Sequence, residues 1–319
     1  MAKPSIDPAW RRTSRELAID LQRLLEQFSG THAAVLERLV DRLRLPRPGQ
    51  KPGLLSHLTL PIALLPVYTA QRLAKLGLRV PAKARRSAVL AAVSGYLAVR
   101  LHDDRLDEGL GSEADAILVG SALLAHHWRC LIDAAGPRGA QPMAQLAATA
   151  WTRYAAAMEL EAAVARAGQP WTQAAWLASL DRYAPMALPS AALLLRGGRQ
   201  HELADHDAML LKLGEAHQIF EDAVDAQADA AAGRPTWVGQ RLAGDEDSAF
   251  LGTAGGMGEA IQWAERALGE ATAIAETLGD TALLVHIAGR RQDMRAWLDD
   301  AVTQLVASLR RALATTPPE

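Results

Sequence analysis

Four carboxylates crowd one predicted helical turn, in the stretch His102-Asp103-Asp104-Arg105-Leu106-Asp107-Glu108. Like charges spaced three and four residues apart on a helix repel one another and lower its stability. A carboxylate cluster that faces a partly buried site therefore needs a cation to neutralise it. The competing explanation is a solvated acidic helix end, and this motif alone does not exclude it.

A second acidic cluster lies much further along the chain and consists of Glu221, Asp222, Asp225 and Asp229. Three of these acids recur at every fourth position, so in a helix of about 3.6 residues per turn they form one ridge, with Asp222 at its shoulder. Two helices that each present such a ridge toward a cavity could hold several hard divalent cations. Mg²⁺ is the expected ion where oxygen ligands meet phosphate.

Taken together and in this order, the two motifs resemble those of the class I isoprenoid synthases, which include trans-prenyl diphosphate synthases and class I terpene synthases. The segment from Gln218 to Asp225 resembles the FQIxDDxxD block of that family. Gly233-Arg234-Pro235-Thr236 falls where the family carries GKxT, and residues 116–123 resemble its AxLxGDxL helix, with Ser121 in place of the aspartate. The resemblance covers residues 85–240.

The resemblance implies an all-α bundle around a central cavity, in which three Mg²⁺ ions bind the diphosphate of an allylic prenyl diphosphate. The implied metal ligands are Asp103, Asp104, Asp107, Glu221, Asp222, Asp225 and Asp229. Arg182 and Arg234 are the candidates for direct contact with the diphosphate, and Gln218 is the candidate for orienting a ligand or a water. Taken alone, either arginine is better explained as a surface residue.

The sequence departs from the family where a second, homoallylic diphosphate would bind. Gly49-Gln50-Lys51-Pro52 keeps at most the lysine of the family's GGKxxRP segment, and Glu108-Gly109-Leu110-Gly111 lacks the arginine pair that follows the first motif. Because cations neutralise bound diphosphates, this loss favours a terpene synthase that releases diphosphate and forms a hydrocarbon or alcohol. A prenyltransferase or trans-prenyl diphosphate synthase is the first alternative, and a non-catalytic helical partner subunit is the second. Substrate chain length and product skeleton are not predictable from these motifs.

The segments that must position these motifs are predicted to be helical. Apolar residues recur at spacings of three and four, and β-branched and aromatic residues are sparse. We expect N-terminal helices within 14–45, a motif-bearing core at 81–240 and C-terminal helices at 259–313. Within the core we expect helices over 81–108, 112–135, 143–167, 171–196 and 203–232, and a loop over 136–142. Pro185 and Pro189 should break or kink the helix over 171–196. Since no Pro/Gly/Ser-rich linker divides the chain, we expect one domain over residues 1–319.

Composition narrows the range of partners. The 319 residues are 50% hydrophobic and carry a formal net charge of −2, so nothing favours binding to nucleic acid. The apolar runs are too short to span a bilayer, and the polar, basic start lacks the apolar core of a secretory signal. Cys130 is the single cysteine, which suits a reducing compartment. We therefore expect a cytoplasmic protein with a small-molecule substrate, and the family resemblance makes a homodimer possible.

Overall fold

The computed structural model describes residues 8–43, 45, 61–108, 113–233, 236–243 and 254–315. Every regular element in these ranges is helical, which confirms the predicted all-α class. The elements are α1 (Pro8–Leu25), α2 (Gly30–Arg42), α3 (Leu65–Lys75), α4 (Ala82–Glu108), α5 (Glu113–Ala167), α6 (Gln173–Ser179), η2 (Leu180–Ala187), α7 (Leu188–Arg196), η3 (Gln200–Glu202), α8 (Leu203–Ala231), α9 (Trp237–Ala243), α10 (Ala254–Leu278) and α11 (Thr281–Thr315).

The chain forms two compact units, and each is assembled from two separate segments. The first unit comprises Met1–Thr152 and Ala184–Asp207, and the second comprises Arg153–Tyr183 and Ala208–Glu319. The boundaries between them fall inside α5, η2 and α8. The expectation of a single domain over 1–319 stays a prediction.

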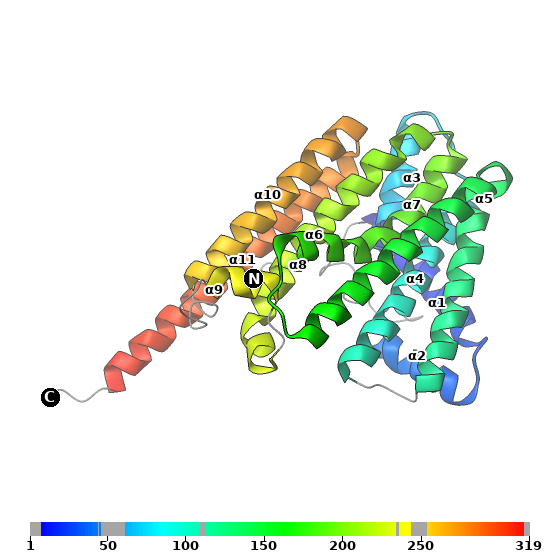
Figure 1. Ribbon diagram of the computed structural model, residues 1–319. Coiled ribbons are helices and arrows are strands. Elements are labelled where there is room, and N and C mark those ends of the chain that lie inside the picture. The colour runs from blue at the N-terminus through cyan, green and yellow to red at the C-terminus, as the bar shows by residue number, and fades with distance from the viewer. Residues whose placement is uncertain are drawn as a thin grey trace. The chain divides into compact units, whose positions relative to one another are not determined.

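The core of the first unit is built where α3, α4 and α7 contact one another (Figure 1). Small residues line the buried face of α4, since Ala84, Ala88 and Ala91 are all almost fully buried. Small side chains let helices approach closely, and larger ones such as Leu73, Leu131 and Leu193 then fill the remaining space.

Helix α1 contacts α4 through an apolar stripe. Leu17, Leu21 and Leu24 are each less than 4% exposed and recur at helical spacing. Beside them, the buried Asp20 accepts two hydrogen bonds from the Arg86 guanidinium of α4. A bidentate arginine–carboxylate pair of this kind adds orientation to the apolar contact.

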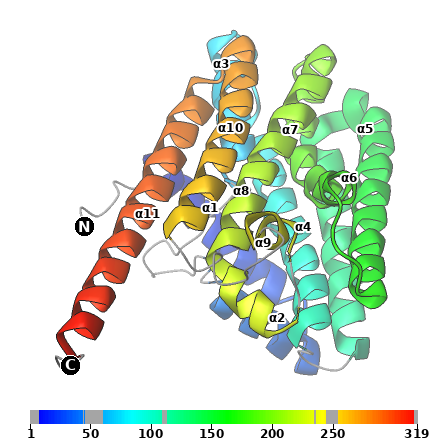
Figure 2. The same ribbon diagram turned by 60° about the vertical axis from the view of Figure 1, so that its left-hand side comes forward.

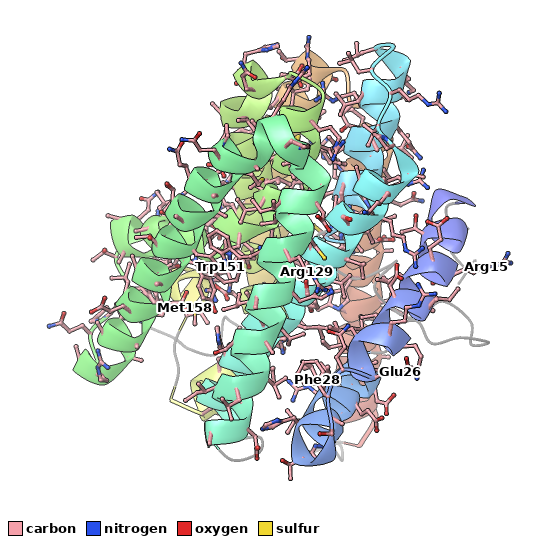
Figure 3. All side chains as sticks on the ribbon, turned by 90° about the vertical axis from the view of Figure 1, so that its right-hand side faces the viewer. Arg15, Glu26, Phe28, Arg129, Trp151 and Met158 are labelled. Atoms are coloured by element: carbon pink, nitrogen blue, oxygen red, sulfur yellow. The ribbon has the colours of Figure 1, made fainter. Side chains whose placement is uncertain are left out.

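Helix α5 bends sharply at Gly136, whose φ of 72° and ψ of 177° are not helical. Arg196 at the end of α7 stabilises the bend, because its guanidinium donates to the Asp133 carbonyl at 2.8 Å and also to the Ala134 carbonyl. The positive φ requires glycine here, and a Cβ at Gly136, 2.6 Å from Arg196 Nη2, would also displace the guanidinium that holds the bend. Arg129 and Trp151 lie on the two limbs of this bent helix (Figure 3).

The loop expected over 136–142 was therefore wrong. The residues that follow Gly136 are helical, including Pro137 and Pro142. Pro137 is acceptable because it takes the first helical position after the bend, where an amide hydrogen has no partner within the helix. The expected break around Pro185 is confirmed, since α6 ends at Ser179 and the 3₁₀ segment η2, which contains Pro185, separates it from α7. Pro189 causes no break of its own and lies in the first turn of α7.

A buried ion network joins α3 to η3 in the first unit. Arg72 and Glu202, with side chains 4% and 6% exposed, form an ion pair, and Arg199 donates two further hydrogen bonds to Glu202. Burial disfavours the charge on Glu202, but the hydrogen bonds from Arg72 and Arg199 outweigh it and lower the pKa of the carboxyl. The neighbouring His206 is buried, and this burial lowers its pKa to about 4, so it is neutral at physiological pH.

The second unit contains a helical hairpin of α10 and α11, which lie side by side (Figures 1 and 2). Its turn uses Gly279, which has a φ of 70°, and the buried Asp280, whose carboxylate accepts a hydrogen bond from the Leu283 amide at 3.1 Å. This bond satisfies one of the free amides at the start of α11. Alanines line the buried face of α10, at positions 260, 264, 267, 271 and 275.

Tryptophans connect α6, α9 and α10 within the second unit. The rings of Trp176 and Trp237 stack with centroids 4.4 Å apart, and Trp263 lies 5.7 Å from Trp237. The Gln240 side chain accepts a hydrogen bond from the Trp171 amide at 2.8 Å, which ties the segment before α6 to α9. These contacts fix the residues that follow the second acidic motif.

Candidate active site

The first acidic motif belongs to α4, which extends to Glu108 as the sequence predicts. The side chains of Asp103, Asp104 and Asp107 lie outside the part of the chain that the structure describes. The preceding residue, His102, is half-buried, and its burial lowers the pKa of the imidazole. The metal-binding role of the three aspartates stays a prediction, as does their position opposite the second motif.

The second acidic motif lies on α8, and its four acids differ in exposure. Asp225 is exposed, Asp229 is half-buried, and the Glu221 side chain is 45% exposed. Asp222, in contrast, is 5% exposed. The expected ridge therefore forms on one helix, but one of its carboxylates turns into the protein.

Gln218, one turn before Asp222, makes the contact that holds this buried carboxylate. Its Nε2 donates to Asp222 Oδ1 at 2.6 Å, and its Oε1 accepts a hydrogen bond from the Tyr183 hydroxyl at 2.7 Å. Burial raises the pKa of Asp222 to about 7, against the smaller lowering effects of Gln218 and Arg182. Because this pKa lies close to neutral pH, small changes in the surroundings can change the charge of Asp222. Such shifted pKa values are common at functional sites.

Arg182 lies near this carboxyl, as a residue of η2. Its Nη2 forms an ion pair with Glu161 Oε1 of α5 at 2.7 Å, and its guanidinium carbon lies 5.9 Å from the centroid of the Tyr183 ring. Contact between Arg182 and a diphosphate stays a prediction. Arg234, the other arginine that the sequence singles out, lies outside the described residues.

Two further side chains surround Glu221. His217 Nδ1 lies 3.7 Å from Glu221 Oε1, and the His217 ring meets the Tyr183 ring edge-on with centroids 6.2 Å apart. Arg290 of α11 is largely buried and forms an ion pair with Asp293 at 3.5 Å. Burial lowers the pKa of Arg290, while the charges of Asp293 and Glu221 act in the opposite direction. The second motif therefore has a cation beside it that belongs to the C-terminal helix.

The carboxylates of α8 are suitable ligands for the Mg²⁺ that the family resemblance implies. Glu221 and Asp225 present accessible carboxylate oxygens, which are hard ligands suited to this ion. Mg²⁺ commonly keeps several waters and takes one or two carboxylates together with substrate phosphates. Within the described ranges, no group of three acidic, histidine or cysteine side chains could hold a metal by itself. The α8 carboxylates fit an ion that is shared with a diphosphate.

Tyr183, Glu161 and Arg290 were missed by the reasoning from sequence. None belongs to either acidic motif, and each reaches the site by tertiary contact from α5, η2 or α11. The one local signal was the position of Tyr183 directly after Arg182. The structure brings Gln218, Asp222 and these missed residues together.

No protein-family model and no curated protein matches the chain. Among solved structures, the chain is similar to geranylgeranyl pyrophosphate synthase from Lactobacillus brevis ATCC 367, with a TM-score of 0.65 and 14% sequence identity. The similarity covers 93% of this chain and 97% of the other. The chain therefore has the isoprenoid synthase fold that its motifs predict. Among the described helices, none is both long enough and apolar enough to cross a membrane.

Proposed function

We propose that the chain is a Mg²⁺-dependent prenyltransferase that takes an allylic prenyl diphosphate as its donor. The observation that supports this most is the fold shared with a geranylgeranyl pyrophosphate synthase over nearly the whole chain. The acidic ridge of α8, with its hydrogen-bonded Asp222, adds a site of suitable chemistry. The neighbour supports prenyl transfer better than the terpene synthase favoured by the sequence.

In the proposed reaction, the allylic carbon–oxygen bond breaks and its electron pair leaves with the diphosphate. The π electrons of the acceptor then form a new carbon–carbon bond to the allylic carbon, and a proton is lost. Bound Mg²⁺ would neutralise the charge that develops on the leaving group. Glu221, Asp225 and Asp229 would provide its protein ligands from α8. Asp103, Asp104 and Asp107 would provide the others, while Arg182 and Arg234 bind the diphosphate.

The terpene synthase is the second candidate, because the stretch Glu108-Gly109-Leu110-Gly111 has no arginine after the first motif. A homoallylic diphosphate brings its own negative charge close to the acids. A unit-charge contact at 4 Å is worth about 4 kcal/mol at an effective dielectric of about 20, before desolvation. An enzyme without such cations would ionise the donor and convert it alone.

The test is to incubate the purified protein with Mg²⁺ and geranyl, farnesyl or geranylgeranyl diphosphate, with and without isopentenyl diphosphate. Prenyl transfer predicts a longer prenyl diphosphate only when isopentenyl diphosphate is present. Hydrocarbon or alcohol products from the donor alone would favour the terpene synthase. No diphosphate release under any condition would contradict both and favour the non-catalytic subunit.

A further inference from the structure

The side chain of Tyr183 is held tightly against α8. It is 7% exposed, and its ring lies directly over Gly214. A Cβ at Gly214 would be 2.5 Å from Tyr183 Cδ2, which is closer than real contacts allow. The His217 ring meets it edge-on from the next turn of the same helix. Glycine at 214 therefore admits the tyrosine ring, and the ring has little freedom to move.

From this position the Tyr183 hydroxyl starts a chain of two hydrogen bonds that ends in the second acidic motif. The hydroxyl donates to Gln218 Oε1 at 2.7 Å, and Gln218 Nε2 donates to Asp222 Oδ1 at 2.6 Å. Burial raises the pKa of the Tyr183 hydroxyl, so it keeps its proton at neutral pH. The phenol thus fixes the oxygen end of the amide, which leaves the nitrogen end directed at the carboxylate.

The orientation of the Gln218 amide matters because its two ends have opposite roles. With the amide reversed, its oxygen would face Asp222, and whenever this carboxyl is ionised both groups would be acceptors with no proton between them. A buried carboxylate without its donor costs more than the bond itself contributes. A fixed donor therefore decides the direction in which Asp222 points.

We propose that Tyr183 is a positioning residue for the second acidic motif, acting through the Gln218 amide to hold the Asp222 carboxylate. This inference rests on the proposed function, since it assigns to Tyr183 the task of ordering an acidic helix that binds metal and diphosphate. The hydrogen bond that connects Tyr183 to this motif goes to Gln218. Its influence passes through Gln218.

The test begins with Tyr183→Phe, which removes the hydroxyl and keeps the ring over Gly214. Loss of one well-ordered hydrogen bond should lower kcat for diphosphate release about tenfold, the factor that corresponds to about 1.4 kcal/mol. The KM for the prenyl diphosphate and the melting temperature should stay near their original values. Tyr68→Phe, at a buried tyrosine of the first unit, is the matched control and should change neither kcat nor KM.

A double-mutant cycle then tests the route of the effect. If Tyr183 acts through Gln218, Tyr183→Phe should cause no further loss in a Gln218→Ala background, so the two effects should not add. Additive losses would overturn the proposal. A lower melting temperature with unchanged kcat would also overturn it, because it would make Tyr183 a structural residue.

The side-chain amide of Gln218 gives a readout that does not depend on activity. Its ¹⁵N-attached protons should be protected from exchange with solvent in the native protein and lose that protection in Tyr183→Phe. Unchanged protection would refute positioning even if activity fell. Absence of diphosphate release by the native protein would refute the proposed function instead, and with it the metal-ordering role, while the amide signal would still decide whether Tyr183 orders Gln218.

Discussion

Neutralising Glu202 should destabilise the protein far more than neutralising a comparable exposed acid. Glu202→Gln keeps the size of the side chain but takes the negative charge away from Arg72, whose side chain is only 4% exposed. Removing one partner of a buried ion pair typically costs about 3–5 kcal/mol, because the other charge stays buried. Gln retains an acceptor for the arginine, so we expect the lower end of this range.

The expected change in melting temperature follows from chain length. The unfolding entropy is about 2.1 cal/mol/K per residue, so in a protein of 319 residues each kcal/mol of lost stability lowers the melting temperature by about 1.5 °C. Glu202→Gln should therefore lower the melting temperature by about 5 °C in differential scanning calorimetry at neutral pH. The matched control is Asp181→Asn, because Asp181 pairs with Arg153 at 2.7 Å but both side chains are more than one quarter exposed. Exposed pairs contribute about 0–1 kcal/mol, so the control should shift the melting temperature by about 1.5 °C or less.

The dependence on pH provides a second check on the same pair. The pKa of Glu202 is lowered in the folded protein. The stability that its ionised form contributes is therefore fully present above the ordinary glutamate pKa and is lost as the pH falls through the lowered value. The difference in melting temperature between the native protein and Glu202→Gln should therefore close in acid. Equal shifts for Glu202→Gln and Asp181→Asn at neutral pH would refute the argument that burial gives this pair its strength.

Three other outcomes are expected. Arg196→Ala should lower the free energy of unfolding in urea by about 1.5–3 kcal/mol, because it removes charged hydrogen bonds to the carbonyls at the α5 bend; an unchanged midpoint would contradict this role. Burial raises the pKa of Asp222 to about 7. The stability that its neutral form contributes is therefore fully present below its ordinary pKa of 3.8 and is lost as the pH rises through about 7. Asp222→Asn should therefore raise the melting temperature relative to the native protein by an amount that grows from acid to neutral pH, and a constant difference would argue against a buried titrating carboxyl. Mg²⁺ with inorganic diphosphate at about 100 times its Kd should stabilise the protein by about 2.7 kcal/mol, and Asp225→Asn should reduce that gain in a thermal-shift assay; an equal gain in both would exclude Asp225 as a ligand.

Helices whose apolar residues recur regularly were predictable from sequence. The expected helix over 81–108 corresponds to α4, and the expected helix over 203–232 corresponds to α8 within one residue. In α1 the regularly spaced Leu17, Leu21 and Leu24 are likewise buried. In such segments the spacing of apolar residues and the helix-ending glycines act locally, so a short window of sequence contains the information.

The bend at Gly136 shows where local reasoning fails. Two prolines and two glycines in residues 136–142 suggested a loop. In the structure, however, Arg196 donates hydrogen bonds to the carbonyls that are left free at the bend, although it lies sixty residues later in the chain. A tertiary partner thus reduces the break to a single residue. Local propensity describes the cost of a helix in isolation and contains no term for such a partner.

The candidate site divides in the same way. The acids of α8 and the position of Gln218 one turn before Asp222 could be predicted, because residues four apart on one helix are neighbours whatever the tertiary fold. The burial and the raised pKa of Asp222 could not, because they depend on the packing of other elements against α8, including Arg182 and Glu161, whose charges act on this carboxyl. Exposure and pKa are properties of the assembled unit, whereas residue spacing belongs to the sequence.

The path of the chain between the two compact units limits how the protein can be divided. Because α5, η2 and α8 each contain a boundary, no single cut yields both units as intact fragments. A fragment ending at Thr152 would lack α7, the partner of both α3 and α4, and would expose the apolar faces that those helices bury. Truncation at such a boundary should therefore produce insoluble fragments. A single crossover with a relative would instead mix two parental sequences within at least one unit, because each unit is made of two separate segments.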